Sequence, residues 1–542
     1  MQEKQMPLWD KFRIKSEYLK CFAAAVGVGM FTHLMVISNK LTNWDDVACL
    51  PGIGMGEFGG RWLQVPLHEI FSKWSGPNLN GAMAVVFYAA AICVIIDMLQ
   101  IRSELGRFAA ILLFMSFPSV ASSMLYMYLT PLFALAVLLM AVSAWLTART
   151  RWGFIPSINL IVAGMALYQG YFSIVTSLLV MAVLIAILEG EACSSIIRES
   201  IKYLLTLGFS MALYLFRLKQ RGLEIVDYKG MNSIGEGGIG QLARAILRTY
   251  HRLLQYFALK PESFMEGLAT RLNAGMLVLL VLLAAAVFVL FKLYREWLRA
   301  LLYAAVLIVL PVALALVYVM AQETEHASTM MTFSYGLIYL LVILLLERVC
   351  ERLQPLGKQK SFRLPSVLFG DRQEKNITLN PGKAAAGILF AGGMALLLVI
   401  GYADLRIDNI AYYRSYTARQ RVDHLYNRVW TRLEEQEGFA AGQKVFMMGE
   451  FPETEKDTDS TIYLMDRELF NDFEGLCTEE GYFLKENRIH YLRLYFGVNV
   501  TEPTLEEMEA MKSYPEYLSM PLWPEEGCIR QIGDAWVVRM GE

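Results

Sequence analysis

Charged residues are scarce in this sequence and make up 18% of its 542 residues. The six histidines form no HExxH or similar cluster, and the seven cysteines show no metal-ligand spacing. There is no Ser/His/Asp order and no nucleotide-binding fingerprint, and the glycine-rich stretch 51–56 lacks the Gly-Lys-Ser/Thr ending of a phosphate loop. These absences argue against an enzyme that binds a nucleotide sugar. We assign no cofactor and no metal site, and we expect no nucleic-acid partner.

Apolar residues make up 56% of the chain, above the roughly 45–50% of ordinary soluble proteins. They gather in long runs, which predicts an all-α polytopic membrane protein with about eleven transmembrane helices, since one span needs about 20 apolar residues. The predicted spans are residues 19–38, 80–101, 107–125, 129–147, 154–168, 171–188, 201–217, 272–292, 298–320, 330–347 and 383–402. Pro118 interrupts one span and the stretch 168–171 separates two others. Such breaks are tolerated where the freed backbone is buried in protein or lines a wet cavity.

The distribution of Lys and Arg predicts the orientation of the chain, because loops rich in these residues stay in the cytoplasm. Basic residues gather before the first span and in alternate short loops. They include Lys4, Lys11, Arg13, Lys15, Lys20, Arg102, Arg107, Arg149, Arg151, Arg198, Lys202, Lys292, Arg295, Arg299, Arg348, Arg352, Lys358, Lys360 and Arg363. We expect a multi-pass protein of the cell membrane with a cytoplasmic N-terminus and no cleavable signal peptide. Loop 39–79, the break at 168–171, loop 218–271 and the region after residue 402 then lie outside the cytoplasm.

Asp45 and Asp46 are adjacent carboxylates in the first outer loop. Ionised groups close to hydrocarbon are costly and usually functional, so one interpretation is a catalytic carboxylate at the membrane surface. Arg61, within the stretch 59–63, would hold an anion near it. The other interpretation is a solvated acidic loop in which Arg61 forms an ion pair with Glu57 or either aspartate.

Residues 240–257 have helical periodicity although they belong to a predicted outer loop. Apolar side chains fall on one broad face, and Arg244, Arg248 and Arg252 recur every fourth residue on the other. We expect an amphipathic helix that lies in the membrane interface. Its basic face is either a solvated surface that touches lipid headgroups or a positive rail that captures a lipid-linked phosphate.

The composition changes after the last predicted span, because acidic residues outnumber basic ones and long apolar runs stop. We therefore divide the chain into a transmembrane domain, 1–402, and a small extracytoplasmic α/β domain, 403–542. Cys477 and Cys528 share the second domain and either form a disulfide or remain two free thiols. The elements predicted there are a helix over 422–437, strands over 444–448 and 461–464, a Thr-capped helix over 504–511 and two strands around Gly533-Asp534 within 528–540.

Three short segments, taken in order, form a pattern. They are Asp45-Asp46 followed by Gly60-Arg61-Trp62-Leu63, then Tyr168-Gln169 between two spans, and a tail from Met520-Pro521 through Pro524 and Gly527 to Ala535-Trp536-Val537-Val538. This pattern resembles the Gtr type II family of serotype-converting O-antigen glucosyltransferases and covers most of the chain as architecture. The resemblance implies a GT-C-like enzyme that transfers a hexose, glucose in that family, from a polyprenyl-phosphate-linked donor. The acceptor is then a cell-surface glycan or glycolipid at the outer face of the membrane, and a separate donor synthase and a small flippase supply the donor.

The residue types suit this chemistry. An Asp can take the proton of the acceptor hydroxyl, and an Arg suits phosphate because its fork makes two charge-assisted hydrogen bonds. Adjacent aspartates rarely aim at one point, so we expect one base and one orienting residue, with Asp46 preferred over Asp45 as the base. A single carboxylate near the anomeric carbon implies inversion. The acidic pair leaves a divalent metal ion open as a participant.

The remaining candidate substrate-binding residues carry alternatives of their own. Arg61 is the first-choice phosphate ligand, with Trp62 beside it. Tyr168 and Gln169 either bind sugar hydroxyls or act as an interfacial Tyr anchor and a helix-end Gln. Arg244 and Arg248 would extend the site along the amphipathic helix.

Two other functions fit a polytopic chain. A lipid or solute transporter is favoured by the span count and the break near 168–171, and disfavoured by the odd number of spans and the absence of a repeat. A glycan polymerase or ligase shares the outward-facing polar loops. Its donor, an oligosaccharide on a diphosphate, distinguishes it from a transferase that uses a monosaccharide on one phosphate.

Overall fold

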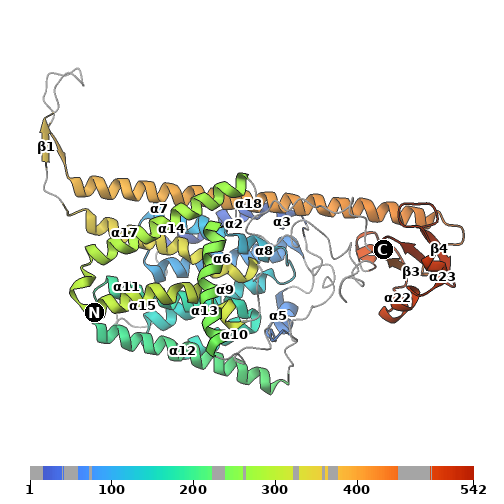
Figure 1. Ribbon diagram of the computed structural model, residues 1–542, viewed down its shortest axis with the longest axis horizontal. Helices are drawn as coiled ribbons and strands as arrows, with labels where there is room; N and C mark the ends of the chain where they lie inside the picture. The colour runs from blue at the N-terminus through green and yellow to red at the C-terminus, as the bar shows by residue number, and fades with distance from the viewer. Residues whose placement is uncertain are drawn as a thin grey trace.

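The structure is a computed structural model that describes residues 16–39, 41, 59–71, 76–222, 239–259, 264–321, 329–356, 360–363, 376–449, 489 and 491–541. A bundle of long apolar helices carries a small α/β unit at one end (Figure 1). Helix α18 (Pro381–Glu434) runs along the bundle and continues into that unit, so a single helix connects the two parts (Figure 1). Its first turn is fixed by Asn380, whose side chain accepts hydrogen bonds from the free amides of Gly382 and Lys383.

Each predicted span overlaps a helix of the bundle. The helices are α2 (Ser16–Thr32), α3 (Leu34–Ser38), α6 (Pro77–Leu99), α7 (Glu104–Met115), α8 (Pro118–Met124), α9 (Thr130–Arg149), α10 (Phe154–Leu167), α11 (Phe172–Leu188), α12 (Cys193–Gln220), α14 (Phe264–Leu290), α15 (Trp297–Leu314), α16 (Val317–Met320), α17 (Leu337–Leu353) and α18. Among the described residues, 8 helices are long and apolar enough to cross a membrane, or 9 if the bent pair α7–α8 forms one span. The chain is therefore a polytopic membrane protein, and the count of eleven spans stays a prediction because α2 and α10 are short.

Both predicted interruptions of the helices are present. Helices α7 and α8 meet at 45°, and Pro118 begins α8, where its missing N–H costs no helical hydrogen bond. Helix α10 ends at Tyr168, whose backbone is extended (φ −160°, ψ 108°), and a short 3-10 helix, η2 (Gln169–Tyr171), leads into α11. The second break leaves backbone carbonyls at the end of α10 that need partners.

Segments predicted to lie on the same side of the membrane contact one another. The Arg149 guanidinium donates to the carbonyl of Met98 at 3.1 Å, and Arg107 pairs with Glu17 at 2.9 Å. Both contacts join basic loops assigned to the cytoplasm. The alternation of the spans is thus consistent with the predicted topology, whereas the absolute orientation stays a prediction.

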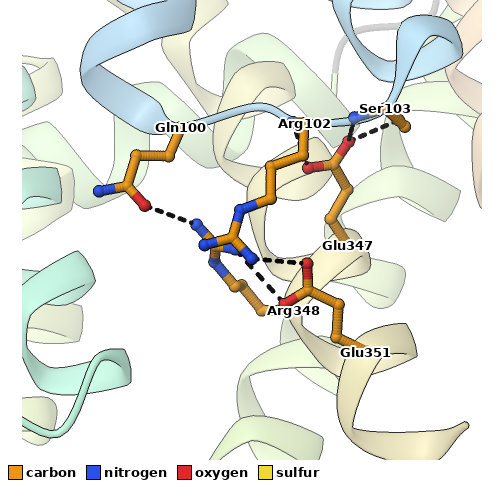
Figure 2. A network of polar contacts seen from close by, with 6 residues as sticks. All are labelled: Gln100, Arg102, Ser103, Glu347, Arg348 and Glu351. Atoms are coloured by element: carbon orange, nitrogen blue, oxygen red, sulfur yellow. Dashed lines mark hydrogen bonds and ion pairs between the residues drawn. The ribbon is translucent and has the colours of Figure 1, made fainter.

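A polar network at this same end fixes α7 to α17 (Figure 2). Ser103 caps α7 by accepting from the amide of Gly106, and buried Glu347 accepts in turn from the amides of Arg102 (2.9 Å) and Ser103 (3.0 Å). A carboxylate is favourable there because the free amides at a helix N-terminus carry partial positive charge. The neighbouring Glu351 pairs with the Arg102 guanidinium at 2.9 Å, but 44% of its side chain is exposed.

The C-terminal unit contains a three-stranded sheet in the order β3-β5-β4. Strands β3 (Lys444–Met448) and β5 (Ala535–Arg539) are parallel, and β4 (Ile529–Ile532) forms a hairpin with β5. The predicted strand over 444–448, the hairpin and the Thr-capped helix are confirmed, the last as α22 (Leu505–Met511), which α23 (Pro515–Leu518) follows. The predicted strand over 461–464 lies outside the described residues.

Alternating side chains of this sheet form two small cores, as the pleat requires. Val445 and Val538 pack against the outer part of α18 at Tyr426, while Phe446 and Val537 face α22. The predicted boundary between residues 402 and 403 falls inside α18, and the division into domains stays a prediction. Cys528 is a buried free thiol, whereas Cys477 lies outside the described residues.

A two-stranded hairpin lies at the opposite end of the molecule from the C-terminal unit (Figure 1). It pairs β1 (Lys360–Arg363) with β2 (Asn376–Leu379) in antiparallel register. The connection between α17 and α18, predicted to be the longest cytoplasmic loop, thus contains a β-hairpin.

The network in Figure 2 predicts unequal roles for two neighbouring glutamates. Glu347→Ala leaves two amides and the Ser103 hydroxyl without their buried acceptor, so we expect a loss of about 2–4 kcal/mol in stability. Glu351→Ala removes the exposed ion pair with Arg102 and a longer contact of 3.4 Å with buried Arg348, which keeps its hydrogen bond to Gln100, so it should cost less, about 1 kcal/mol. Thermal unfolding of both variants in detergent measures the difference, and equal melting temperatures would contradict this account of the network.

Candidate functional site

The break between α10 and α11 is closed by residues from the first predicted outer loop. The amide of Leu63 donates to the carbonyl of Ala166 at 3.2 Å, and the side chain of Gln64 donates to the carbonyl of Leu167 at 2.7 Å. Gln64 begins the short helix α5 (Gln64–Phe71). Carbonyls freed at the end of α10 therefore find partners in a segment roughly one hundred residues earlier in the chain.

The carboxamide of Gln169 joins this segment to two further helices. Its nitrogen donates to the carbonyl of Gly59 and to the hydroxyl of Tyr214 on α12, the latter at 2.8 Å. Its oxygen accepts from Nε of Arg61 at 3.4 Å, and the Tyr214 hydroxyl donates to the carbonyl of Gly60 at 3.2 Å. Only 2% of Gln169 is exposed. One buried side chain thus fixes the backbone just before Arg61.

Glycine is required at position 60. Its φ of +74° lies in the left-handed region, and an added Cβ would lie 2.8 Å from the Tyr214 hydroxyl and 2.9 Å from the Gln169 nitrogen. A side chain there would displace the groups that position Arg61.

The Arg61 guanidinium lies over the ring of Tyr168, 4.9 Å from its centroid. Within the described residues only Nε of Arg61 is hydrogen-bonded, and its two terminal nitrogens have no partner there. Trp62 stacks on Tyr214 with 5.1 Å between the ring centroids, and the Arg221 guanidinium lies over the Trp62 ring at 5.7 Å. The arrangement presents cations on an aromatic and hydroxyl-bearing surface.

The structure therefore brings together four of the eight site residues predicted from the sequence: Arg61, Trp62, Tyr168 and Gln169. Asp45 and Asp46 lie outside the described residues, and so does Glu57. Among the described residues no group of three or more His, Cys, Asp or Glu side chains is arranged to hold a metal ion.

Arg244 and Arg248 lie on another element, the predicted amphipathic helix. Helix α13 (Ile239–Leu254), followed by a short π-helix, η4 (Gln255–Leu259), packs against α15 and α16 and runs across the bundle rather than along it (Figure 1). Its buried face contains Thr249 and Leu253, whereas Leu247 is exposed although the sequence places it on the apolar face. Arg244 is exposed and Arg248 is half-buried. The helix is confirmed, and its role in substrate binding stays a prediction.

A tract of buried aromatic rings leads inward from Arg61. Tyr168 packs on Tyr171 at 4.7 Å, Tyr171 on Phe333 at 5.4 Å, and Phe333 stacks on Tyr88 at 5.8 Å. Phe333 belongs to a 3-10 helix, η6 (Thr329–Gly336), that precedes α17. The Tyr88 hydroxyl shares a hydrogen bond of 2.8 Å with Ser123. The interior of the bundle therefore contains hydroxyl groups from these tyrosines as well as apolar ring surfaces.

The sequence analysis missed a polar group at the far end of this tract. Asp404 and Asp408 are both buried on α18, one helical turn apart, and Tyr412 follows one turn later. His33, at the junction of α2 and α3, shares a hydrogen bond of 2.8 Å with the Tyr412 hydroxyl. A spacing of four between carboxylates directly after a span is a signal for one polar helix face. We missed this pattern because we expected the helix to end with its span at residue 402, whereas α18 continues past both aspartates.

The helices and this group of residues define a polytopic membrane protein with a cluster of polar and aromatic side chains at one end of its bundle. Residues 34–345 match the family Glucosyl transferase GtrII. Because the match covers more than half of the 542 residues, the chain belongs to the GtrII glucosyltransferase family, as its motifs predicted. It is a membrane glucosyltransferase that uses a sugar donor and an acceptor. Comparisons with curated proteins and with solved structures returned no match.

The position of Gly60 yields a prediction about activity. Gly60→Ala should displace Arg61 and lower glucosyl transfer by at least about tenfold, because small misplacements at a reacting site are costly. Gly222→Ala is the matched control: Gly222 also has a positive φ, +60°, but an added Cβ there meets nothing within 4 Å. Transfer of labelled glucose by membranes with equal amounts of each variant measures the effect. Wild-type activity in Gly60→Ala would contradict the proposed importance of this contact.

Proposed function

We propose that this glucosyltransferase takes glucose from a polyprenyl-phosphate carrier and transfers it to a cell-surface glycan or glycolipid at the outer face of the membrane. The observation that carries the proposal is the placement of Arg61, whose terminal nitrogens have no partner within the described residues, beside buried Tyr168 and Gln169 at a helix break. A cation at the end of an apolar bundle suits a phosphate whose lipid chain lies along the helices.

Arg61 binds the donor phosphate in this proposal. Its planar fork gives two parallel hydrogen bonds to phosphate oxygens, and the charge stabilises the phosphate as it leaves the sugar. In this proposal Trp62 and Tyr168 contribute to substrate binding by holding the guanidinium groups of Arg221 and Arg61 on their ring faces, while Gln169 holds Arg61 in place. Arg244 and Arg248 on α13 form a second basic surface, which captures the lipid phosphate near the headgroups before it reaches Arg61.

The base comes from the acidic pair of the first outer loop. Asp46, or Asp45 in the alternative assignment, accepts the proton of the acceptor hydroxyl as the oxygen attacks the anomeric carbon. The carbon–oxygen bond to the phosphate breaks in the same displacement, which inverts the anomeric configuration. Phosphate is a good leaving group without protonation, so the reaction requires no general acid and no organic cofactor.

We base the proposed orientation of the protein in the membrane on the loops that are rich in Lys and Arg, which stay in the cytoplasm. The end of the bundle with Arg107, Arg149 and the network of Figure 2 faces the cytoplasm, and the end with Arg61 and the C-terminal unit faces outward. In this arrangement a donor synthase loads the carrier on the cytoplasmic side and a flippase turns it outward.

A purified-component assay tests the proposal. Wild-type protein in detergent should transfer labelled glucose from polyprenyl phosphate to the membrane glycolipid fraction of the producing cells. Because detergent leaves no sealed compartment, transport cannot account for the product. Transfer from UDP-glucose in place of the lipid-linked donor would contradict the proposed donor.

The same assay tests the base. Loss of a general base costs about 10²–10⁴-fold in rate, so either Asp45→Asn or Asp46→Asn should lose activity by this factor. Asp534→Asn, in the exposed hairpin turn between β4 and β5, is the matched control and should retain full activity. Full activity in both loop variants would exclude an aspartate base in this loop.

A further inference from the structure

Three polar side chains form a row on one face of α18 where the helix leaves its apolar part. Asp404, Asp408 and Tyr412 are spaced by four residues and continue the buried apolar face formed by Leu397 and Ile400. Asp404 is 1% exposed, and Asp408 and Tyr412 are 0% exposed. Both aspartates lie beyond residues 34–345, the part of the chain matched to the family.

Neighbouring helices enclose this row. His33 contacts Tyr412 through one ring nitrogen and the carbonyl of Met115 through the other, at 2.8 and 2.9 Å. The Ser116 hydroxyl donates to the carbonyl of Gly401 at 3.2 Å, and α3 and α8 both pack against α18. The junctions α2–α3 and α7–α8 therefore lie beside the row, and both ring nitrogens of His33 are engaged.

The two carboxylates have no protein partner in the part of the chain that the structure describes. None of their four oxygen atoms accepts a hydrogen bond within the described residues. Other carboxylates in the bundle do accept hydrogen bonds. Glu347 accepts from two backbone amides, and Asp97 accepts from the Trp145 indole at 2.6 Å. Burying a polar group without a partner is costly and unusual in native structures. Such a cost at two adjacent positions indicates that donors come from a ligand.

The row connects to the aromatic tract that leads from Arg61. His33, which is hydrogen-bonded to the Tyr412 hydroxyl, also contacts the carbonyl of Met115, and the neighbouring Phe114 ring packs against Tyr88 with 6.3 Å between the centroids. Tyr88 stacks on Phe333, which begins the path back to Tyr168 beneath Arg61. On the enclosing helix α8, the buried Ser122 hydroxyl also has no partner within the described residues. The tract therefore has a cationic end and an end rich in hydrogen-bond acceptors.

We propose that Asp404 and Asp408 bind hydroxyl groups of the acceptor sugar. Glucosyl transfer brings the donor sugar and the acceptor sugar together. The cationic end of the tract suits the phosphate of the donor, and the end with the two aspartates suits a neutral sugar. Carboxylates repel the donor phosphate but accept hydrogen bonds from neutral sugar hydroxyls. The proposal rests on the proposed function, which places the donor phosphate at Arg61.

The test separates acceptor binding from donor use. It measures three quantities on purified protein: slow hydrolysis of polyprenyl-phosphate glucose in water, transfer to the glycolipid fraction of the producing cells, and the melting temperature. We expect Asp404→Asn and Asp408→Asn to raise the apparent KM for the glycolipid fraction at least about tenfold, the effect of losing one hydrogen bond to a charged group. Donor hydrolysis and donor KM should stay within about twofold of wild type. Asn409→Ala, an exposed neighbour on the same helix, is the control and should change none of the three.

The melting temperature distinguishes a ligand-binding role from a structural one. Removing an unpartnered buried carboxylate should leave the protein as stable or more stable, as expected for residues kept for function. Unfolded or clearly destabilised asparagine variants, an unchanged acceptor KM, or a raised donor KM would each overturn the proposal. A wild type that neither hydrolyses nor transfers from the lipid donor would instead refute the proposed function, and the acceptor site would fall with it.

Discussion

The hydrogen bonds of the Gln169 carboxamide are the contact on which the candidate site depends. Helix α10 ends at Leu167, and just beyond it the buried side chain of Gln169 reaches α12 and residues 59–61 at once. A buried amide can satisfy several partners only in one geometry, so it fixes Arg61 more firmly than an apolar contact would. The Arg61 guanidinium also rests on the ring of Tyr168. Gly60, which has no side chain, lets the Tyr214 hydroxyl and the Gln169 carboxamide come close to the backbone before Arg61. A loop segment thereby gains the rigidity that binding an anion requires.

Much of the fold could be predicted from the sequence because a span in lipid requires a long apolar helix whose backbone groups are hydrogen-bonded within the protein. Long apolar runs, the break at Pro118 and the stretch 168–171 all correspond to features of the helices, and the apolar stretch 444–448 is a strand, as predicted. The sequence analysis treated the span 383–402 and the helix 422–437 as separate elements, whereas α18 runs without a break from Pro381 to Glu434. Apolar content locates a span, but it does not locate the end of the helix that contains it.

The residues of the candidate site also fall into two groups, those that the sequence predicted and those that it did not. Arg61 and Trp62 were accessible to sequence reasoning because they belong to a short motif in the first predicted outer loop, and Tyr168 and Gln169 because they separate two apolar runs. Asp404 and Asp408 were not, since their significance depends on burial by α3 and α8, which are distant in the chain. The family match also ends before them. Tertiary packing, rather than any local pattern, turns two helix-surface aspartates into a buried pair without donors among the described residues.

The account places the Arg61 end of the bundle outside the cytoplasm, and α12 offers a direct measurement of this. Exposed Ser194 and Gln220 lie at opposite ends of α12, and Gln220 is on the side of Tyr214 and Arg61. Cysteines introduced one at a time at these positions, in a background with all seven native cysteines replaced by Ser, can be labelled in intact cells with a membrane-impermeant maleimide. The account predicts labelling of Gln220→Cys in intact cells and of Ser194→Cys only after permeabilisation. The reverse pattern would put the site in the cytoplasm and contradict transfer at the outer face.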